Sequence, residues 1–180
     1  MTRLVRETRE TRVEITLSPG TGSADVATGL PFLDHMLTAF AAYAALDLTL
    51  RATGDLKHHR IEDVAITVGE AVLRLVPERA CRYGERTIPM DDALVHVAID
   101  LGGRPFYEGP LPSSLYDHWM RSFAMHSRST LHVRALRGND RHHVVEAAFK
   151  ALGLAVRQAL EERGAVFSTK GGVRWEEGSC

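Results

Sequence analysis

Cysteine is almost absent from the sequence, which has only Cys81 and Cys180 among its 180 residues. Two cysteines in these positions provide neither the disulfide framework of a small secreted domain nor a cysteine-rich zinc site. Any metal ion that the chain binds must therefore be held by histidine and carboxylate side chains.

The sequence also lacks an excess of charge of either sign, and it lacks long apolar runs. Its 22 Lys and Arg residues are interspersed with 23 Asp and Glu residues, for a net charge of -1. This balance offers no basic surface of the kind that nucleic acid requires, so nucleic acid is not expected as a partner. No apolar stretch approaches the roughly 20 residues that span a bilayer, and the start MTRLVRETRETR lacks the apolar core of a signal peptide. We expect a cytoplasmic protein that does not contact membranes.

Histidine, by contrast, is concentrated in a motif that occurs twice. His58 and His59 begin HHRIE at 58–62, and His142 and His143 begin HHVVE at 142–146. Residues three and four apart share one face of a helix, so each motif can present imidazole and carboxylate together. This combination suits Mn, Fe, Zn, Ni or Co, and ligand type alone does not choose among them.

An Asp-His pair precedes each motif at a nearly constant distance. His35 in FLDHML lies 23 residues before His58, and His118 in LYDHWM lies 24 residues before His142. One isolated HHxxE could simply cap a helix or face solvent, but a repeated lead and motif indicate an internal duplication. Adjacent histidines on a helix diverge by about 100°, which favours two metal sites or a site shared across an interface.

Hydrophobic periodicity places these motifs in a repeated order of elements. Alternation predicts strands at 13–17, 46–52, 93–101 and 130–136, and helical spacing predicts helices at 33–45, 60–75, 118–124 and 144–160. Residues 108–116 are predicted to form a loop. We therefore expect an α+β fold, a single domain over 1–180 made of two similar halves at about 1–92 and 93–180. Each half would be a small mixed or antiparallel sheet with helices on one face.

Two further groups of residues are candidates for binding an anion. Arg82 and Arg104 lie near glycines at predicted element ends, where a guanidinium either binds an anion or remains a surface charge. Ser168, Thr169 and Lys170 precede two glycines and could cradle a phosphate, although they form no Walker motif. The histidines outside the motifs are better explained by packing than by metal binding; they are His96, His126 and His132.

The sequence resembles the imidazoleglycerol-phosphate dehydratases of histidine biosynthesis over most of its length. The matching segments, in order, are RETRET at 6–11, GTG at 20–22, LPFLDHML at 30–37, GDL at 54–56, HHRIED at 58–63, RYG at 82–84, PMDDAL at 89–94, GRP at 103–105, HHVVEAAFKAL at 142–152 and STKG at 168–171. The resemblance implies a duplicated α+β fold, like the second domain of ribosomal protein S5. It also implies a manganese-dependent lyase that dehydrates D-erythro-imidazole glycerol phosphate to imidazole acetol phosphate, and a 24-subunit shell with active sites at subunit contacts.

Transferred position by position, the resemblance implies two Mn²⁺ ions in each active site. One ion would be bound by His35, His58, Glu62 and His143, and the other by His59, His118, His142 and Glu146. The implied catalytic residues are Glu10, as the acid/base group, with His35, Glu62 and Glu146. The implied substrate-binding residues are Glu10, Tyr43, Arg82, Arg104, Lys150, Ser168, Thr169 and Lys170, of which Arg82, Arg104, Ser168 and Lys170 would hold the phosphate.

The chain departs from the family pattern in three places. Tyr43 stands where the family usually has histidine, and tyrosine is a poor base near neutral pH. Arg60 stands where the family has threonine, and about three residues, including an aspartate, are missing between GDL and the first HH. Loss of a carboxylate behind the metal ligands would lower metal affinity by about 10- to 100-fold. Every implied ligand is nevertheless present, so we expect an active dehydratase.

Two other functions are compatible with the same residues. A different dinuclear metalloenzyme, a hydrolase or an oxidase, would act on phosphoesters or consume O₂ with iron. A catalytically impaired shell or storage protein of the same family would bind metal and assemble without turnover. Because the ligands are divided between the two repeats, we also expect that removal of the metal weakens assembly.

Overall fold

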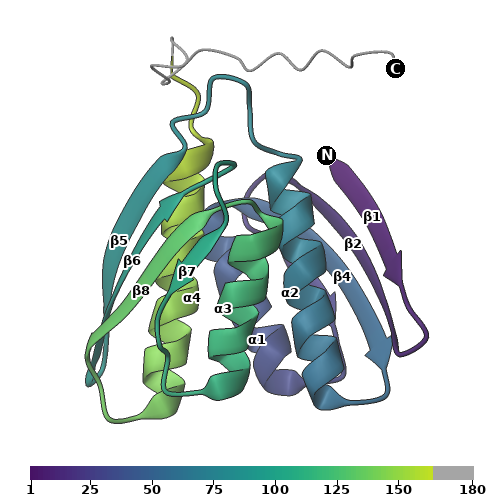
Figure 1. The fold of residues 1–180 in the computed structure, drawn as a ribbon, viewed down its shortest axis with the longest axis horizontal. Helices are drawn as coiled ribbons and strands as arrows, with labels where there is room; N and C mark the ends of the chain where they lie inside the picture. Colours follow the sequence, from purple (N-terminus) through teal and green to yellow (C-terminus); the bar gives the residue numbers. More distant parts are fainter. Residues whose placement is uncertain (164–180) are drawn as a thin grey trace, which may run out of the picture.

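Two four-stranded sheets flank a layer of helices in the computed structural model, which describes residues 1–163 (Figure 1). The first sheet has the order β1-β2-β4-β3, with β1 (Thr2–Glu7), β2 (Thr11–Pro19), β3 (Ala24–Ala27) and β4 (Leu46–Gly54). The second has the order β5-β6-β8-β7, with β5 (Tyr83–Met90), β6 (Ala93–Asp100), β7 (Phe106–Glu108) and β8 (Thr130–Arg137). The helices are α1 (Pro31–Ala44), α2 (Lys57–Leu73), α3 (Ser114–His126) and α4 (Arg141–Leu160).

The two sheets have the same topology, which confirms the predicted duplication. In each sheet the last strand pair, β3 with β4 or β7 with β8, is parallel, and the other pairs are antiparallel. Strands β2 and β6 bury every second residue against the helices, as a sheet covered on one face requires. Among residues 1–163, no helix combines the length and the apolar character that crossing a bilayer requires.

The structure corrects the predicted boundary between the halves. Strand β5 pairs with β6, so the second half begins at or before Tyr83 and not at residue 93. Strand β5 was missed because it is an edge strand with most of its residues exposed, so the sequence shows little alternation there. The predicted loop at 108–116 is also wrong at both ends, because it contains the last residue of β7 and the start of α3.

The helices pair across the two halves. Helix α1 packs against α4, and α2 packs against α3. The two helices of each pair approach each other closely where they cross, because one of them has a glycine at that point. A Cβ atom on Gly153 of α4 would lie 2.7 Å from the carbonyl oxygen of Phe40 in α1, and one on Gly69 of α2 would lie 2.7 Å from that of Phe123 in α3. Each half thus places one of its helices directly against a helix of the other half.

We expect Gly153→Ala to destabilise the protein. The added methyl group would push α1 away from α4, and such overpacking costs about 1 to 3 kcal/mol in the free energy of unfolding. Denaturant unfolding of the metal-free chain measures this, with Thr38→Ala on the exposed side of α1 as the control. An unchanged free energy of unfolding in Gly153→Ala would show that the two helices can separate without cost.

Candidate metal centre

The two HHxxE motifs lie in the first turns of α2 and α4, which begin at the same end of the molecule (Figure 1). At α4 the side chain of Asp140 caps the helix, accepting a hydrogen bond of 2.7 Å from the backbone amide of His142. At α2 the capping position is Leu56, which offers no side-chain acceptor. The prediction that both motifs open a helix is confirmed.

In each Asp-His pair that precedes an HHxxE motif, the aspartate accepts hydrogen bonds from the chain that leads into its own helix, α1 or α3. Asp34 accepts hydrogen bonds from the backbone amide of Thr28, at 2.8 Å, and from the Thr28 hydroxyl, at 2.6 Å. Asp117 accepts them from the Tyr107 hydroxyl, at 2.5 Å, and from the Leu111 amide, at 2.9 Å. These contacts fix the first turns of α1 and α3, and with them the histidine that follows each aspartate.

One group of possible metal ligands, which we call the His35 cluster, consists of His35, His142 and Glu146. The Nε2 atoms of both histidines lie 3.1 Å from the same oxygen, Oε2 of Glu146. The Glu146 side chain is only 8% exposed, whereas that of His35 is 52% exposed. The cluster therefore has a buried carboxylate at its base and two imidazoles open to solvent, and it joins α1 of the first half to α4 of the second.

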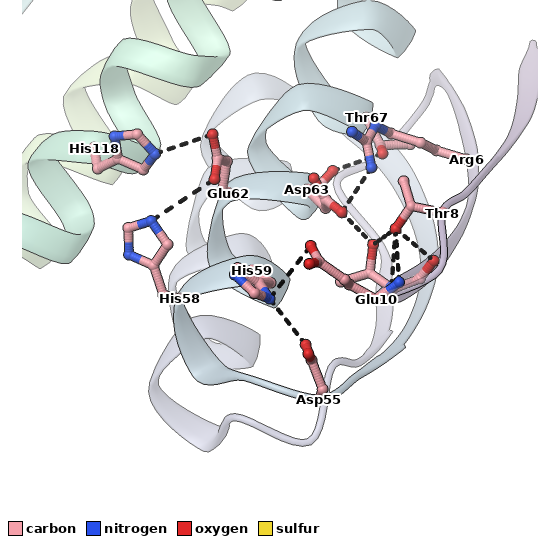
Figure 2. Close-up of polar contacts among 11 residues, drawn as sticks. Arg6, Thr8, Glu10, Asp55, His58, His59, Glu62, Asp63, Thr67 and His118 are labelled. Atoms are coloured by element: carbon pink, nitrogen blue, oxygen red, sulfur yellow. Dashed lines mark hydrogen bonds and ion pairs between the residues drawn. The ribbon is translucent and has the colours of Figure 1, made fainter.

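The second group, the His118 cluster, consists of His58, Glu62 and His118 and joins α2 to α3 (Figure 2). The Nε2 atom of His118 lies 3.3 Å from Oε1 of Glu62, and that of His58 lies 3.7 Å from Oε2. The two rings are stacked with centroids 5.0 Å apart. His118 Nε2 is buried and has no hydrogen-bond partner among the described residues. A buried imidazole nitrogen of this kind, facing a carboxylate, is well suited to bind a cation.

Within one chain, the residues of the two clusters are grouped differently from the two sets of metal ligands that the resemblance implies. Both clusters combine the two halves, as expected, but His35 meets Glu146 instead of Glu62, and His118 meets Glu62 instead of Glu146. The cause is helix packing, because α1 lies against α4 and α2 against α3. That all eight residues bind metal stays a prediction.

The second histidine of each pair, His59 or His143, belongs to neither cluster. The Nδ1 atom of His59 lies 2.9 Å from Asp55 Oδ1, and that of His143 lies 2.8 Å from Asp92 Oδ1. These hydrogen bonds are the main reason that the pKa of each histidine is raised. Glu10 joins His59 and Asp55 in a third group of closely spaced ligand atoms. Asp55, the aspartate of the GDL segment, thus supplies a carboxylate at His59 although the residues between GDL and the first HH are fewer than in the family.

The turn between β1 and β2 brings Glu10 to this place (Figure 2). Oε2 of Glu10 lies 3.5 Å from Nδ1 of His59. The hydroxyl of Thr8 accepts hydrogen bonds from the amides of Glu10, at 3.1 Å, and Thr11, at 3.0 Å. The Thr11 hydroxyl in turn donates to the buried carboxylate of Asp63 in α2. Helix α2 therefore carries His59 and also anchors the turn that presents Glu10.

Two predicted substrate-binding residues, Lys150 and Tyr43, lie beside the His35 cluster. Lys150 Nζ donates to Oε1 of Glu146 at 2.8 Å and lies 5.7 Å from the centre of the Tyr43 ring. Burial disfavours the charged form of Glu146, but hydrogen bonds from Lys150 and His35 outweigh it, so the pKa of Glu146 is lowered. The His118 cluster has no lysine at the corresponding position. Ile66 stands four residues after Glu62, just as Lys150 stands four residues after Glu146.

A cavity of about 480 Å³ opens next to His142 at the same end of the molecule. Basic side chains, Lys57 and Arg141, line it together with Phe32 and Tyr116. Its volume falls within the range of small-molecule sites, and its walls offer both cationic and aromatic surface.

Arg82 and Arg104 lie at the opposite end of α4. The Arg82 amide donates to the carbonyl oxygen of Ala159, at 2.9 Å, and its guanidinium pairs with Asp100 at 2.9 Å. A Cβ atom on Gly103 would lie 2.6 Å from Arg82 Nη2, so this guanidinium packs directly beside the residue before Arg104. From position 142 to position 159 a helix rises roughly 25 Å. The two arginines of a chain are therefore far from the metal clusters of the same chain.

Sequence reasoning found the residues of both clusters but not their grouping, and it missed Asp55 and Asp92, the carboxylates that contact the second histidines. Asp55 stands four residues before His59, so the spacing of helix neighbours was a signal that could have found it. Asp92 is 51 residues from His143 and had no such signal. The predicted phosphate-binding residues Ser168, Thr169 and Lys170 lie outside the described residues.

Comparisons with known proteins find similarity to one enzyme family. The family model for imidazoleglycerol-phosphate dehydratase matches residues 28–156. The imidazoleglycerol-phosphate dehydratase of Pyrobaculum calidifontis is 46% identical over 92% of this chain and 96% of its own length. That of Corynebacterium jeikeium is 41% identical over 92% and 93%. A crystal structure of the Pyrococcus furiosus protein matches with a TM-score of 0.86 and 40% identity, covering 94% of this chain and 100% of the other. The Staphylococcus aureus enzyme matches with a TM-score of 0.80 and 32% identity, covering 89% and 98%.

Proposed function

Because the chain belongs to the imidazoleglycerol-phosphate dehydratase family, we propose that it dehydrates imidazole glycerol phosphate to imidazole acetol phosphate in histidine biosynthesis, using two Mn²⁺ ions per active site. The observation that carries this proposal is the pair of clusters. Two imidazoles and a carboxylate meet twice, at equivalent positions of a duplicated fold.

The residues present fit a divalent metal ion. In both clusters the imidazoles face a carboxylate with Nε2, and nitrogen with carboxylate oxygen is a donor set that Mn²⁺ accepts. Each cluster supplies three ligands, which leaves coordination positions for further ligands and for substrate. We propose that His59 and His143 of other copies complete the two sites, since in their own chain they belong to neither cluster.

The reaction breaks a C–O bond at the carbon attached to the imidazole ring and a C–H bond at the next carbon. The hydroxyl leaves as water after gaining a proton, and the resulting enol becomes the ketone when a proton is added to carbon. A bound metal ion would supply Lewis-acid stabilisation of negative charge on the substrate's imidazole. We propose that Glu10, whose side chain is 59% exposed beside His59, takes up and returns the protons.

We propose that another copy of the chain holds the phosphate end of the substrate. From imidazole to phosphate the substrate spans only about six bonds, or roughly 10 Å at most. In a single chain, Arg82 and Arg104 lie roughly 25 Å from the clusters along α4. If they bind the phosphate, each active site combines the clusters of one copy with the arginines of another, and the proposed 24-subunit shell would supply such contacts between copies.

Turnover of imidazole glycerol phosphate by the Mn²⁺-loaded protein tests the proposed function. We expect conversion to imidazole acetol phosphate that stops on chelation and returns when Mn²⁺ is added back. Metal-loaded protein that assembles but turns nothing over would favour the storage function. Activity on phosphoesters, or O₂ consumption with iron, would favour the other dinuclear enzymes.

Light scattering of the same samples tests the predicted link between metal and assembly. If ligands from different copies meet at one ion, chelation is expected to reduce the particle size. A particle of the same size with and without chelator would show that assembly does not depend on the metal.

A further inference from the structure

His59 and His143, the second histidines of the two HHxxE motifs, each place Nδ1 against an aspartate, but the two aspartates are not at equivalent positions of the repeat. Asp55 precedes His59 by four residues, at the start of α2 (Figure 2). Asp92 lies in the turn between β5 and β6 and reaches His143 across 51 residues of sequence. The turn equivalent to that of Asp92, between β1 and β2, also brings a carboxylate towards Nδ1 of His59, because Oε2 of Glu10 lies 3.5 Å from it. The shorter contact in the first half is nevertheless that of Asp55, at 2.9 Å. Both halves therefore place a carboxylate at Nδ1 of the second histidine, although the residues that make the shortest contact are not equivalent.

From this we propose that Asp55 and Asp92 are positioning residues, which hold His59 and His143 with Nδ1 against a carboxylate and Nε2 as the atom that binds a metal ion. The inference rests on the proposed function, in which these histidines complete metal sites of other copies. In both clusters, too, it is Nε2 that faces the shared carboxylate.

The chemistry of imidazole explains why the contact matters. A neutral imidazole carries its proton on either nitrogen, and only the other nitrogen has a lone pair for a metal ion. A carboxylate at Nδ1 keeps the proton there, leaves the lone pair on Nε2 and fixes the orientation of the ring. Without it, each histidine would lose both the favoured tautomer and the fixed direction of its free nitrogen.

Both carboxylates are held in place by the backbone. Oδ1 of Asp55 accepts a hydrogen bond of 2.5 Å from the Leu56 amide. Oδ2 of Asp92 accepts two, from Asn139 at 2.6 Å and Asp140 at 3.1 Å, which leaves Oδ1 for His143. Each aspartate therefore connects the start of an HHxxE helix to the histidine that the helix carries.

Asp55 contacts His59 even though the segment before the first HH is shorter than in the family. Family members have an additional aspartate there, and its absence predicted a weaker metal site. In this chain α2 begins at Lys57, two residues after Asp55, and the spacing of four residues brings Asp55 to Nδ1 of His59. The GDL aspartate thus supplies a carboxylate at His59 in a chain that lacks the additional aspartate.

Calorimetric titration of the full-length, metal-free protein with Mn²⁺ tests the inference. Asp55→Ala is expected to weaken Mn²⁺ binding by about 10- to 100-fold. Asp55→Asn keeps an oxygen acceptor for Nδ1 and is expected to lose less. Asp25→Ala is the matched control, because Asp25 is an exposed carboxylate that pairs with Arg51, and it should bind Mn²⁺ like the unmodified chain.

The decisive comparison is made with His59→Ala. If Asp55 acts through His59, the double variant Asp55→Ala/His59→Ala should bind Mn²⁺ no more weakly than His59→Ala alone. Losses that add would show that Asp55 acts on the fold instead, and unchanged affinity in Asp55→Ala would remove its role. Unmodified protein that binds Mn²⁺ but turns over no substrate would contradict the proposed function while leaving this comparison intact. Unmodified protein that binds no Mn²⁺ would overturn both.

Discussion

His118→Ala is expected to lower kcat/KM for dehydration by roughly 1000-fold, because a Lewis-acid metal contributes several kcal/mol to transition-state stabilisation and each 1.4 kcal/mol is a factor of ten. The substitution removes the buried Nε2 atom that faces Glu62 and so leaves the His118 cluster with two ligands. Steady-state kinetics with metal content measured on the same samples gives the result.

His126→Ala is the matched control, since His126 lies on the same helix and in neither cluster. Its kcat/KM should stay close to that of the unmodified protein. Full activity in His118→Ala after loss of bound metal would mean that this cluster does not take part in the reaction. If the unmodified protein has no activity and His118→Ala only loses bound metal, the result is the one expected of a storage protein.

Mixing two inactive variants, His118→Ala and Arg104→Ala, is expected to restore activity once the copies exchange. The clusters lie at the end of the molecule where α2 and α4 begin, whereas Arg104 follows Gly103, which packs beside Arg82 at the far end of α4, so an active site would take them from different copies. With random exchange of equal amounts, about a quarter of the sites would combine an intact cluster with an intact arginine. The variants are dissociated by chelation, mixed, reassembled with Mn²⁺ and assayed.

The control for this mixing experiment pairs His118→Ala with His58→Ala. Both residues belong to the His118 cluster within one chain, so no copy in that mixture has the cluster intact and activity should not return. Equal recovery in both mixtures would show that the ligands of this cluster come from different copies. No recovery in either, with exchange verified by mass, would place the arginines and the clusters in separate functions.

The elements that sequence analysis predicted are those with a clear period. Strands β2, β4, β6 and β8 and the four helices of residues 1–163 were all anticipated, because the apolar residues of each recur with the period of a strand or of a helix. Strands β1 and β5 were missed because they are edge strands, which bury little. Strands β3 and β7 have four and three residues, too few for alternation to be recognised.

The residues of the candidate site could be predicted from the sequence, but the way they group into two clusters could not. The spacing of HHxxE is local, and it correctly placed His58 with Glu62 and His142 with Glu146. Which lead histidine joins which motif depends on helix packing, and the close crossings at Gly69 and Gly153 decide it. No periodicity along the chain carries that information.

The pairing of helices across the halves also bears on how such a protein could arise. Neither half holds a complete cluster, but two copies of a half-length chain, docked through the same helix contact, would hold two identical ones. A symmetric dimer would then have been able to bind metal before the gene was duplicated and fused. In a single fused chain the two clusters can differ, and here they do, since Lys150 lies beside Glu146 whereas Ile66 occupies the corresponding position four residues after Glu62.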